Sequence, residues 1–260
     1  MSKCANRCPE IIPESDPVDQ ARRRLLAGAA AMSAVALAPG VMLYSAGSAE
    51  ARKLGTAASS KVRWGILIDV SQCPDGCTEC VTACKTENGW EGKGPAGTNP
   101  EWIRNVALKD KKTGAAKSVP MMCQHCEEPP CVDVCPTGAS FKRADGIVLV
   151  DKHICIGCRY CMMACPFAAR SFVHEPASNQ KPHAPRGKGT VEACTMCVHR
   201  VDADGTPACV EACNKADNRS MTFGDLNNPN SDIAKAVGRH LATRIRADLG
   251  LGQGVLYTGL

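Results

Sequence analysis

The sequence predicts a loop-rich α+β fold built from duplicated modules. Its interior is organised by cysteines and the groups that they bind. The chain of 260 residues contains 18 cysteines but only 4% aromatic residues, so large apolar side chains are scarce. Sixteen of the cysteines lie beyond residue 60 in four groups of four, and every group closes with a C-x3-C step. A pattern that recurs in this way indicates internal duplication. At about 100–200 residues per domain, the length allows one or two domains.

The cysteine groups point to a bound metal cofactor. In chain order they are Cys73, Cys77, Cys80 and Cys84; Cys123, Cys126, Cys131 and Cys135; Cys155, Cys158, Cys161 and Cys165; and Cys194, Cys197, Cys209 and Cys213. The third group reads CIGCRYCMMACP, which is C-x2-C-x2-C-x3-C-P without a deviation. Three thiolates on such a loop suit three corners of a cubic iron–sulfur cluster. Gly157 permits the loop to curl so that backbone N–H groups face the sulfurs.

Two other interpretations of the cysteines are weaker. Zinc sites use pairs of cysteines separated by longer loops, and the second and fourth groups could imitate such pairs, but the third group has a further cysteine two residues on. Disulfides are disfavoured because cysteines so close together on one loop rarely reach disulfide geometry with each other. In the iron–sulfur pattern the fourth cysteine of a group serves the other cluster of a pair.

The segments between the groups predict short regular elements. We expect a buried strand at 64–70, a half-buried strand at 102–108, a hairpin at 140–150 with its turn at Asp145-Gly146, and a return strand at 170–174. Short helices should follow the cysteine loops near 78–87, 130–135, 158–165 and 207–213. The tail has apolar residues at helical spacing, so we expect a helix over 231–249 that packs through Ile233, Val237, Leu241 and Ile245.

The N-terminal segment 1–51 has the features of an export signal. Consecutive arginines, Arg22 to Arg24, precede a stretch from Leu25 to Ala49 that carries no charge. This resembles a twin-arginine signal, whose pathway exports folded proteins, and folded export suits a chain that receives a cofactor first. Small residues at 45–51 suit a signal peptidase, but the uncharged stretch is also long enough for a retained membrane anchor. Either outcome places the body on the periplasmic side, and Cys4 and Cys8 receive no role.

Charge and composition exclude some functions. The formal charge of the chain is +5. Sixteen thiolates that bind four clusters, each with a core charge of about +2, would bring the net charge to about −3. No arginine-rich stripe supports nucleic-acid binding, and no set of side chains suggests a catalytic site. His125 lies between Cys123 and Cys126 and is expected to face solvent, with a hydrogen bond near a cluster as the alternative. The Pro- and Gly-rich loop 176–190, with Lys181, His183, Arg186 and Lys188, is either a solvated surface loop or a docking loop for a partner.

Three stretches carry a resemblance to a known family. They are RWGILIDVSQCPDGCTECVTACKTENGW, MMCQHCEEPPCVDVCPTGASFKRADGIVLVDKHICIGCRYCMMACP and HAPRGKGTVEACTMCVHRVD. Over residues 62–227 the chain resembles the four-cluster iron–sulfur subunits of polysulfide and dimethyl sulfoxide reductases, and within them the DsrO-type periplasmic subunits of the DsrMKJOP membrane complex. The resemblance implies tandem bacterial-ferredoxin-like modules. The inner module covers about 118–175, the outer one covers 62–117 plus 176–227, and 228–260 forms a helical tail.

The resemblance also implies that the groups pair in a nested order around four [4Fe–4S] clusters. Cluster 1 would be held by Cys73, Cys77, Cys80 and Cys213; cluster 2 by Cys194, Cys197, Cys209 and Cys84; cluster 3 by Cys123, Cys126, Cys131 and Cys165; and cluster 4 by Cys155, Cys158, Cys161 and Cys135. Two departures concern the outer pair. The first group has an extra residue before Cys77, which Gly76 could absorb, and no proline follows Cys84 or Cys213.

The function implied is electron relay without a substrate site of its own. Electrons would pass between a quinone-interacting membrane subunit of the NrfD type and a periplasmic multihaem cytochrome c, within a Dsr complex of dissimilatory sulfur metabolism. A second hypothesis makes the chain the electron-transfer subunit of an exported molybdopterin oxidoreductase. A third, from another class, is a structural or zinc-sensing protein. The metal content separates the third hypothesis from the first two.

Overall fold

The computed structural model describes residues 57–91, 96–114, 116–178, 180–216 and 218–260, together with the strands β1 (Ala36–Ala38) and β2 (Val41–Met42). The chain divides into two units, Met1–Ala49 and Glu50–Leu260. In the first unit β1 and β2 pair antiparallel, and the rest of the predicted export signal lies outside the described residues. Within the described part of the chain, none of the helices has both the length and the apolar character needed to cross a membrane.

A three-stranded sheet forms the base of the second unit. Its central strand β3 (Trp64–Asp69) pairs antiparallel with β10 (Met221–Asp225) and parallel with β11 (Val255–Thr258). The inner residues of β3 are all buried because the strand has neighbours on both edges and is covered on both faces. Gly65 is required here, since a Cβ at this position would lie 2.7 Å from the carbonyl oxygen of Gly254.

Three antiparallel strand pairs complete the β structure. The longest joins β4 (Ile103–Lys109) to β5 (Ala116–Met122). A short hairpin joins β6 (Ser140–Lys142) to β7 (Val148–Val150), and Gly146 at its turn has φ of +85°. The third pair, β8 (Ser171–Phe172) with β9 (Val191–Glu192), brings together the ends of a long loop.

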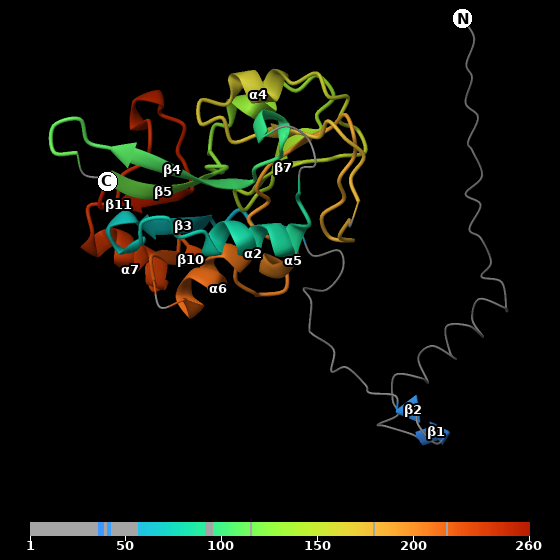
Figure 1. The fold of residues 1–260 in the computed structure, drawn as a ribbon, viewed down its shortest axis with the longest axis horizontal. Helices are drawn as coiled ribbons and strands as arrows, with labels where there is room; N and C mark the ends of the chain where they lie inside the picture. The colour runs from blue at the N-terminus through green and yellow to red at the C-terminus, as the bar shows by residue number, and fades with distance from the viewer. Residues whose placement is uncertain are drawn as a thin grey trace, which may run out of the picture. The chain divides into compact units, whose positions relative to one another are not determined.

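The helices are short, and most contain or adjoin cysteines. α2 (Glu79–Asn88) packs against α6 (Ala208–Lys215), and α3 (Pro130–Asp133) packs against α4 (Tyr160–Ala164). The four-residue helix α5 (Val198–Val201) follows Cys197. Figure 1 shows α2, α5 and α6 together at one end of this unit and α4 at the opposite end. Helices from the first and fourth cysteine groups are therefore neighbours, as are helices from the second and third.

The predicted elements are confirmed with small differences in their bounds. Strands form at 64–69, 103–109 and 171–172, the hairpin over 140–150 has its turn at Asp145-Gly146, and helices follow the cysteine loops. The sequence interpretation missed β5, β9, β10 and β11. For β10 and β11 the partner β3 lies far away along the chain, and β5 contains Pro120 and polar residues that weaken its local strand signal.

The helix expected over 231–249 is wrong in extent. α7 (Asp232–Arg239) begins after the N-cap Ser231, whose hydroxyl accepts a hydrogen bond from the Ala234 N–H at 3.2 Å, and it ends at Arg239. Ile233 is fully buried, but Leu241 is 95% exposed and does not continue the stripe. The last residues form β11 at the edge of the central sheet, and the buried Tyr257 hydroxyl donates to the Pro120 carbonyl at 3.1 Å.

The prediction that His125 faces solvent is also wrong. Its side chain is fully buried, and Nδ1 accepts a hydrogen bond from the Val148 N–H of β7 at 3.0 Å. Desolvation, together with the charges of Arg63 and Arg170, lowers the pKa of His125 to about 3, so the ring is neutral. His125, which lies between Cys123 and Cys126 in the sequence, thus links the second cysteine group to the hairpin that leads to the third group.

We expect Leu256→Ala to lower the free energy of unfolding by about 2–5 kcal/mol, because it opens a cavity behind the β11 strand. Leu256 is 4% exposed. The matched variant Leu241→Ala should change stability by less than about 0.5 kcal/mol, since that side chain is already in solvent. Denaturant unfolding under anaerobic conditions measures both. Equal effects of the two variants would contradict the assignment of the tail to the central sheet.

His125→Leu should destabilise the protein by about 1–3 kcal/mol, because the buried Val148 N–H loses its acceptor. His153→Leu is the control, since His153 is exposed and its contact with Asp151 is made by the backbone N–H alone. Thermal unfolding of the two variants beside the unmodified protein gives the comparison. Unchanged stability of His125→Leu would show that the hydrogen bond to β7 contributes nothing.

Candidate iron–sulfur sites

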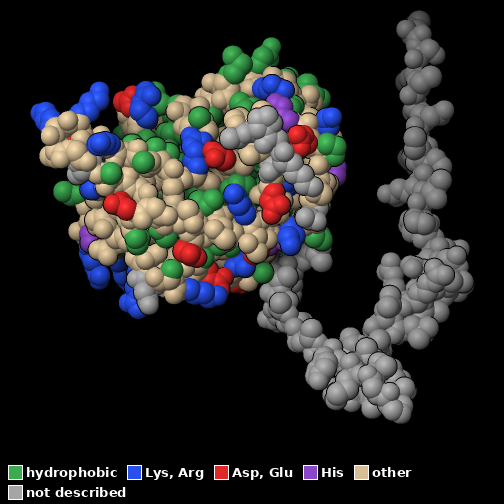
Figure 2. Space-filling view, viewed as in Figure 1, with side chains coloured by type: hydrophobic (Ala, Val, Ile, Leu, Met, Phe, Trp, Pro, Cys, Tyr) green, Lys and Arg blue, Asp and Glu red, His purple; other side chains and the backbone are tan. Residues whose placement is uncertain are grey.

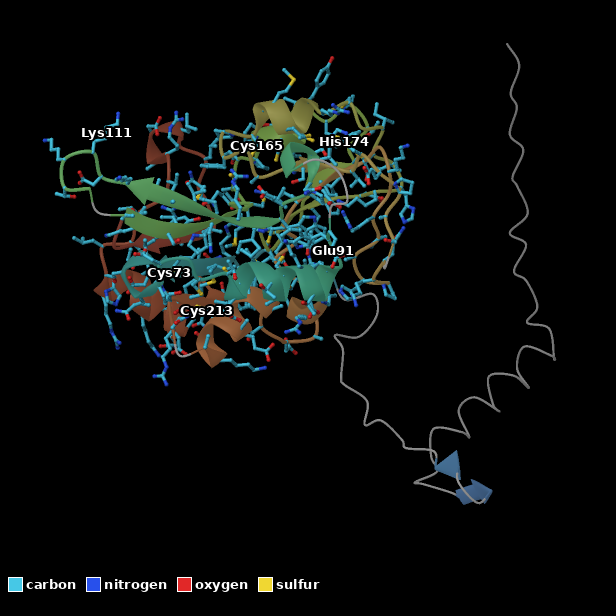
Figure 3. The ribbon with its side chains drawn as sticks, in the orientation of Figure 1. Cys73, Glu91, Lys111, Cys165, His174 and Cys213 are labelled. Carbon is cyan, nitrogen blue, oxygen red and sulfur yellow. The ribbon has the colours of Figure 1, made fainter. Side chains whose placement is uncertain are left out.

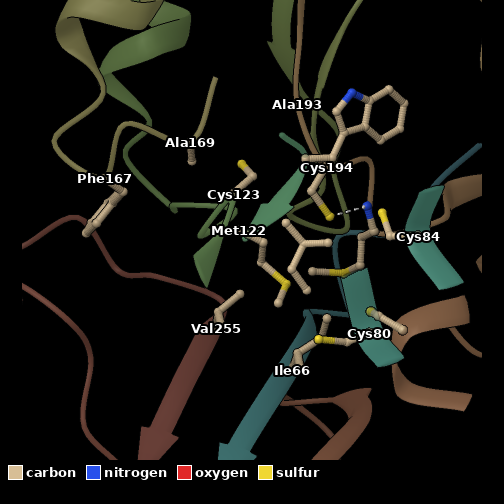
Figure 4. Close-up of a cluster of buried hydrophobic side chains, with 14 of the residues drawn as sticks. Ile66, Cys80, Cys84, Met122, Cys123, Phe167, Ala169, Ala193, Cys194 and Val255 are labelled. Atoms are coloured by element: carbon tan, nitrogen blue, oxygen red, sulfur yellow. Dashed lines mark hydrogen bonds between the residues drawn. The ribbon is translucent and has the colours of Figure 1, made fainter. Parts of the chain in front are cut away.

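All sixteen cysteines of the four groups are free thiols, so no pair among them forms a disulfide. They are also largely withdrawn from water: nine belong to the main buried core. Figure 4 shows Cys80, Cys84, Cys123 and Cys194 within this core, beside apolar side chains such as Ile66 and Met122. Such a concentration of buried, unpaired thiols is chemically suited to a metal ion or cluster that takes thiolate ligands.

Cysteines of the second and third groups line two separate cavities. One cavity is lined by Cys123, Cys126 and Cys131 of the second group and by Cys165 of the third, together with apolar side chains such as Phe167. The other is lined by Cys155, Cys158 and Cys161 of the third group and by Cys135 of the second. The last cysteine of each group thus lines the cavity of the other group.

A third set of thiols combines the first and fourth groups. Cys73 and Cys77 precede α2, and Cys80 lies in its first turn. Cys213 of α6 lies near Cys73 (Figure 3). Burial, followed by the charges of Cys73, Cys77 and Cys213, raises the pKa of the Cys80 thiol to about 12. Four sulfurs therefore influence one another although Cys213 is remote from the other three in sequence.

The fourth set is the most deeply buried. Burial raises the pKa of the Cys194 thiol well above its ordinary value, and the charges of Cys84, Cys209 and Cys197 add to the shift. Cys84 comes from the first group, so this set has the composition that the resemblance assigns to cluster 2. Burial also raises the pKa of Cys84 to about 12, against hydrogen bonds from Trp90 and Asn88. The indole Nε1 of Trp90 donates to the Cys84 sulfur at 3.1 Å.

Hydrogen-bond donors around the sulfurs fit thiolate ligands. Backbone N–H groups of Ser140, Val191 and Met196 point at Cys135, Cys155 and Cys194, with N–S distances of 3.3, 3.5 and 3.4 Å. Such donors stabilise negative charge on sulfur and influence cluster potential. A buried thiol with a raised pKa loses its proton only when positive charge lies nearby. Bound iron would supply that charge, and the thiol would release its proton as it binds. The donors around Cys135, Cys155 and Cys194 therefore fit iron–sulfur ligation at these positions.

The loops that carry the thiols are tightly curled. Gly157, between two cysteines of the third group, has φ of +70°, and a Cβ there would lie 2.0 Å from the carbonyl oxygen of Gly189. The predicted role of Gly157 in this curl is thus confirmed. Gly76 has φ of +72°, and the Cys77 N–H donates to the Pro74 carbonyl at 3.1 Å. A turn closed in this way accommodates the extra residue of the first group.

Arg170 is a site residue that the sequence interpretation missed, since the sequence pattern predicts only a strand there. The guanidinium is buried, lines both inner cavities and donates from Nη2 to the Cys131 sulfur at 3.0 Å. Its Nε and Nη1 atoms have no hydrogen-bond partner within the described structure. Orphaned donors of a buried cation beside two cavities indicate that anionic groups belong in those cavities. An arginine four residues after the CP pair was the available signal.

At Arg186, loop 176–190 is neither exposed to solvent nor open to a partner protein. This side chain is 5% exposed and forms a bidentate ion pair with Glu192, with both N–O distances 2.9 Å. A further donor, Nη1, reaches the Gly89 carbonyl at 3.0 Å. Arg186 therefore fastens the loop to the body and is not available for a partner. A buried pair of this kind is sensitive to loss of either member.

A second tie joins the same loop to the outer helices. The Glu87 carboxylate of α2 binds His199 Nε2 and Arg200 Nη2 of α5, each at 2.7 Å. His183 of the loop stacks on the His199 ring at 3.8 Å between centroids and contacts the Glu87 carbonyl oxygen. Hydrogen bonding to Arg200, with a further contribution from His199, lowers the pKa of Glu87 to about 2. Because Glu87 is already shared by these partners, the group serves as a tie between segments.

Comparison with known proteins agrees with this geometry. Residues 114–226 match the 4Fe-4S dicluster domain family. The chain is 41% identical over 227 residues to the Hdr-like menaquinol oxidoreductase iron-sulfur subunit 1 of Archaeoglobus fulgidus, covering 77% of this chain and 84% of that protein. It is 35% identical over 206 residues to the B subunit of the tetrathionate reductase of Salmonella typhimurium, covering 78% and 74%. With protein NrfC of Escherichia coli the identity is 36% over 236 residues, covering 88% and 91%.

The match to the dicluster domain family spans the second, third and fourth cysteine groups. The iron-sulfur subunit of a putative dimethyl sulfoxide reductase of Halobacterium salinarum is also 37% identical over 214 residues. The family match and the convergent thiols show that the chain binds [4Fe–4S] clusters. It belongs to the family of ferredoxin-like iron–sulfur electron-transfer subunits that includes those of the Hdr-like menaquinol oxidoreductase and of dimethyl sulfoxide reductase.

Proposed function

We propose that this chain is an electron-transfer subunit that relays single electrons through four [4Fe–4S] clusters and has no substrate site of its own. The observation that carries the proposal is that eight of the free cysteines line two cavities, four at each, with a common wall residue, Arg170. When bound, such clusters accept and release one electron at a time. Sites that share a wall suit transfer between them.

The ligand sets of this proposal follow the nested order. The two inner cavities supply cluster 3, with Cys123, Cys126, Cys131 and Cys165, and cluster 4, with Cys155, Cys158, Cys161 and Cys135. Packing of α2 against α6 supports cluster 1, with Cys73, Cys77, Cys80 and Cys213, and cluster 2, with Cys194, Cys197, Cys209 and Cys84. In this arrangement the domain consists of two ferredoxin-like modules, one nested in the other.

The cluster 4 end offers a place for an electron partner. Cys158 is the exposed member among the described cysteines, and Ile156, Tyr160 and Met163 beside it are 66%, 58% and 83% exposed. Figure 2 shows apolar side chains projecting over the region that Figure 1 labels α4. Exposed apolar groups around a cofactor ligand favour contact with another protein. A partner docked there would approach cluster 4 closely.

For the complex itself we propose a DsrO-type role. The chain would connect a quinone-interacting membrane subunit of the NrfD type with a periplasmic multihaem cytochrome c, among the other Dsr subunits of dissimilatory sulfur metabolism. Similarity to a menaquinol oxidoreductase subunit supports a quinone-linked complex. The arginines at 22–24 support export by the twin-arginine route to the periplasmic side of the membrane, with the signal cleaved or kept as an anchor.

One alternative has support of its own. Subunits of tetrathionate reductase and of a putative dimethyl sulfoxide reductase are both similar to this chain. An electron-transfer subunit of an exported molybdopterin oxidoreductase would carry the same clusters. Affinity purification of the tagged chain from native membranes is expected to recover a membrane subunit and a haem-containing cytochrome. Recovery of a large molybdopterin subunit in their place would favour the alternative.

Metal analysis tests the proposal first. Anaerobically purified protein should contain about sixteen irons and sixteen acid-labile sulfides per chain, because four cubic clusters each hold four of both. About twelve irons would mean that an irregular outer site is empty. Zinc in place of iron, or no metal, would refute electron transfer.

Paired substitutions test which cysteines share a cluster. Cys123→Ala combined with Cys165→Ala should affect one cluster only, because both residues line the same cavity. Cys123→Ala combined with Cys135→Ala should affect two clusters. Iron, sulfide and the electron paramagnetic resonance signals count the clusters altered. The reverse result, with the second combination confined to one cluster, would show that each group holds its own cluster without exchange.

A further inference from the structure

We propose that Arg170 raises the reduction potentials of both inner clusters, acting as one cationic hydrogen-bond donor shared by two sites. This inference rests on the proposed function, since it takes the ligand sets of clusters 3 and 4 from it. Arg170 is 5% exposed and lines the cavity of Cys131 as well as the cavity of Cys161. Its position between the cavities is the first observation behind the proposal.

Unsatisfied donors are the second observation. A guanidinium has five N–H donors, and here Nη2 donates to Cys131 while Nε and Nη1 are buried without a partner in the described structure. Burying a charge is unfavourable unless opposite charge accompanies it. An oxidised cubic cluster with four thiolates carries a net charge of about −2, so clusters in the two cavities would provide that opposite charge.

The effect on potential follows from the charge change. Reduction adds one electron, delivered by the neighbouring carrier of the complex, and no bond or proton has to move. The guanidinium stays protonated throughout. A fixed positive charge stabilises the more negative reduced state more than the oxidised state, so the potential rises.

Among the residues that the structure describes, no charged side chain donates a hydrogen bond to a sulfur of the outer cysteines. Within the described residues, the side chains that hydrogen-bond to outer cysteine sulfurs are neutral, namely those of Trp90, Asn88, Asn218 and Ser220. Two further cationic side chains, Arg63 and Lys152, lie near the inner cysteines, but their N–H groups donate to carbonyl or carboxylate oxygens and not to sulfur. Arg63 donates to three carbonyls and pairs with Glu127, and Lys152 donates to the Val191 carbonyl at 2.8 Å. Loss of the Arg170 charge should therefore affect the inner pair and leave the outer pair unchanged.

The test is a redox titration of the anaerobically purified full chain, followed by electron paramagnetic resonance. The variants are Arg170→Gln, which removes the charge, and Arg170→Lys, which keeps it without the fork of donors. Arg104→Gln is the matched control, because Arg104 donates to the carbonyls of Phe167 and Ala168 on the same loop but contacts neither cavity. Iron and sulfide are measured on every sample.

With iron content unchanged, two midpoints should move to more negative potentials in Arg170→Gln. They should move less in Arg170→Lys and stay unchanged in Arg104→Gln. Unchanged midpoints in a fully loaded Arg170→Gln protein would overturn the inference and leave electron transfer intact. A shift of a single midpoint would refute the shared role. Loss of iron from both Arg170 variants would assign the residue to site assembly and also overturn the inference. Absence of iron–sulfur clusters from the unmodified protein would instead refute the proposed function.

Discussion

Convergence of buried cysteine sulfurs from distant segments is the constraint on which this structure depends. The main core contains nine cysteines among its buried residues, where another domain of this size would place large aromatic and aliphatic side chains. Burial raises the pKa of Cys80 to about 12, so the thiolate form that binds iron is unfavourable there until cationic metal offsets its charge. Cluster loading and folding are therefore expected to be one process, in keeping with short helices and small sheets that bury little surface by themselves.

The supporting contacts are arranged around that constraint. Loop 176–190 has few regular contacts, yet Arg186 with Glu192 and His183 with Glu87 hold it beside the cluster 2 segments. His125 joins the second cysteine group to β7 through a buried hydrogen bond, and neutral donors such as Trp90 approach the outer sulfurs. Arg186, His183 and His125 each hold a cysteine-bearing segment in place, and Trp90 stabilises negative charge on a cysteine sulfur.

Charge distribution gives the two modules different properties. A buried arginine serves the inner pair, and neutral side chains serve the outer pair. The exposed side chains around Cys158 occur at the inner end, where a partner could approach. Within the short segment 155–170, Arg170 thus influences the reduction potentials of the inner clusters, and the residues around Cys158 control how closely a partner protein approaches.

The sequence by itself determined the features that depend on local spacing. The C-x2-C-x2-C-x3-C-P run, Gly157, the turn at Asp145-Gly146 and the helices after the cysteine loops all follow from residues a few positions apart. The tertiary structure decided what depends on distant partners. β11 pairs with a strand almost the whole domain away, His125 is buried by a hairpin that follows it, and Arg170 reaches two cavities. No local pattern encodes these contacts, because burial and electrostatic environment are set only when remote segments pack together.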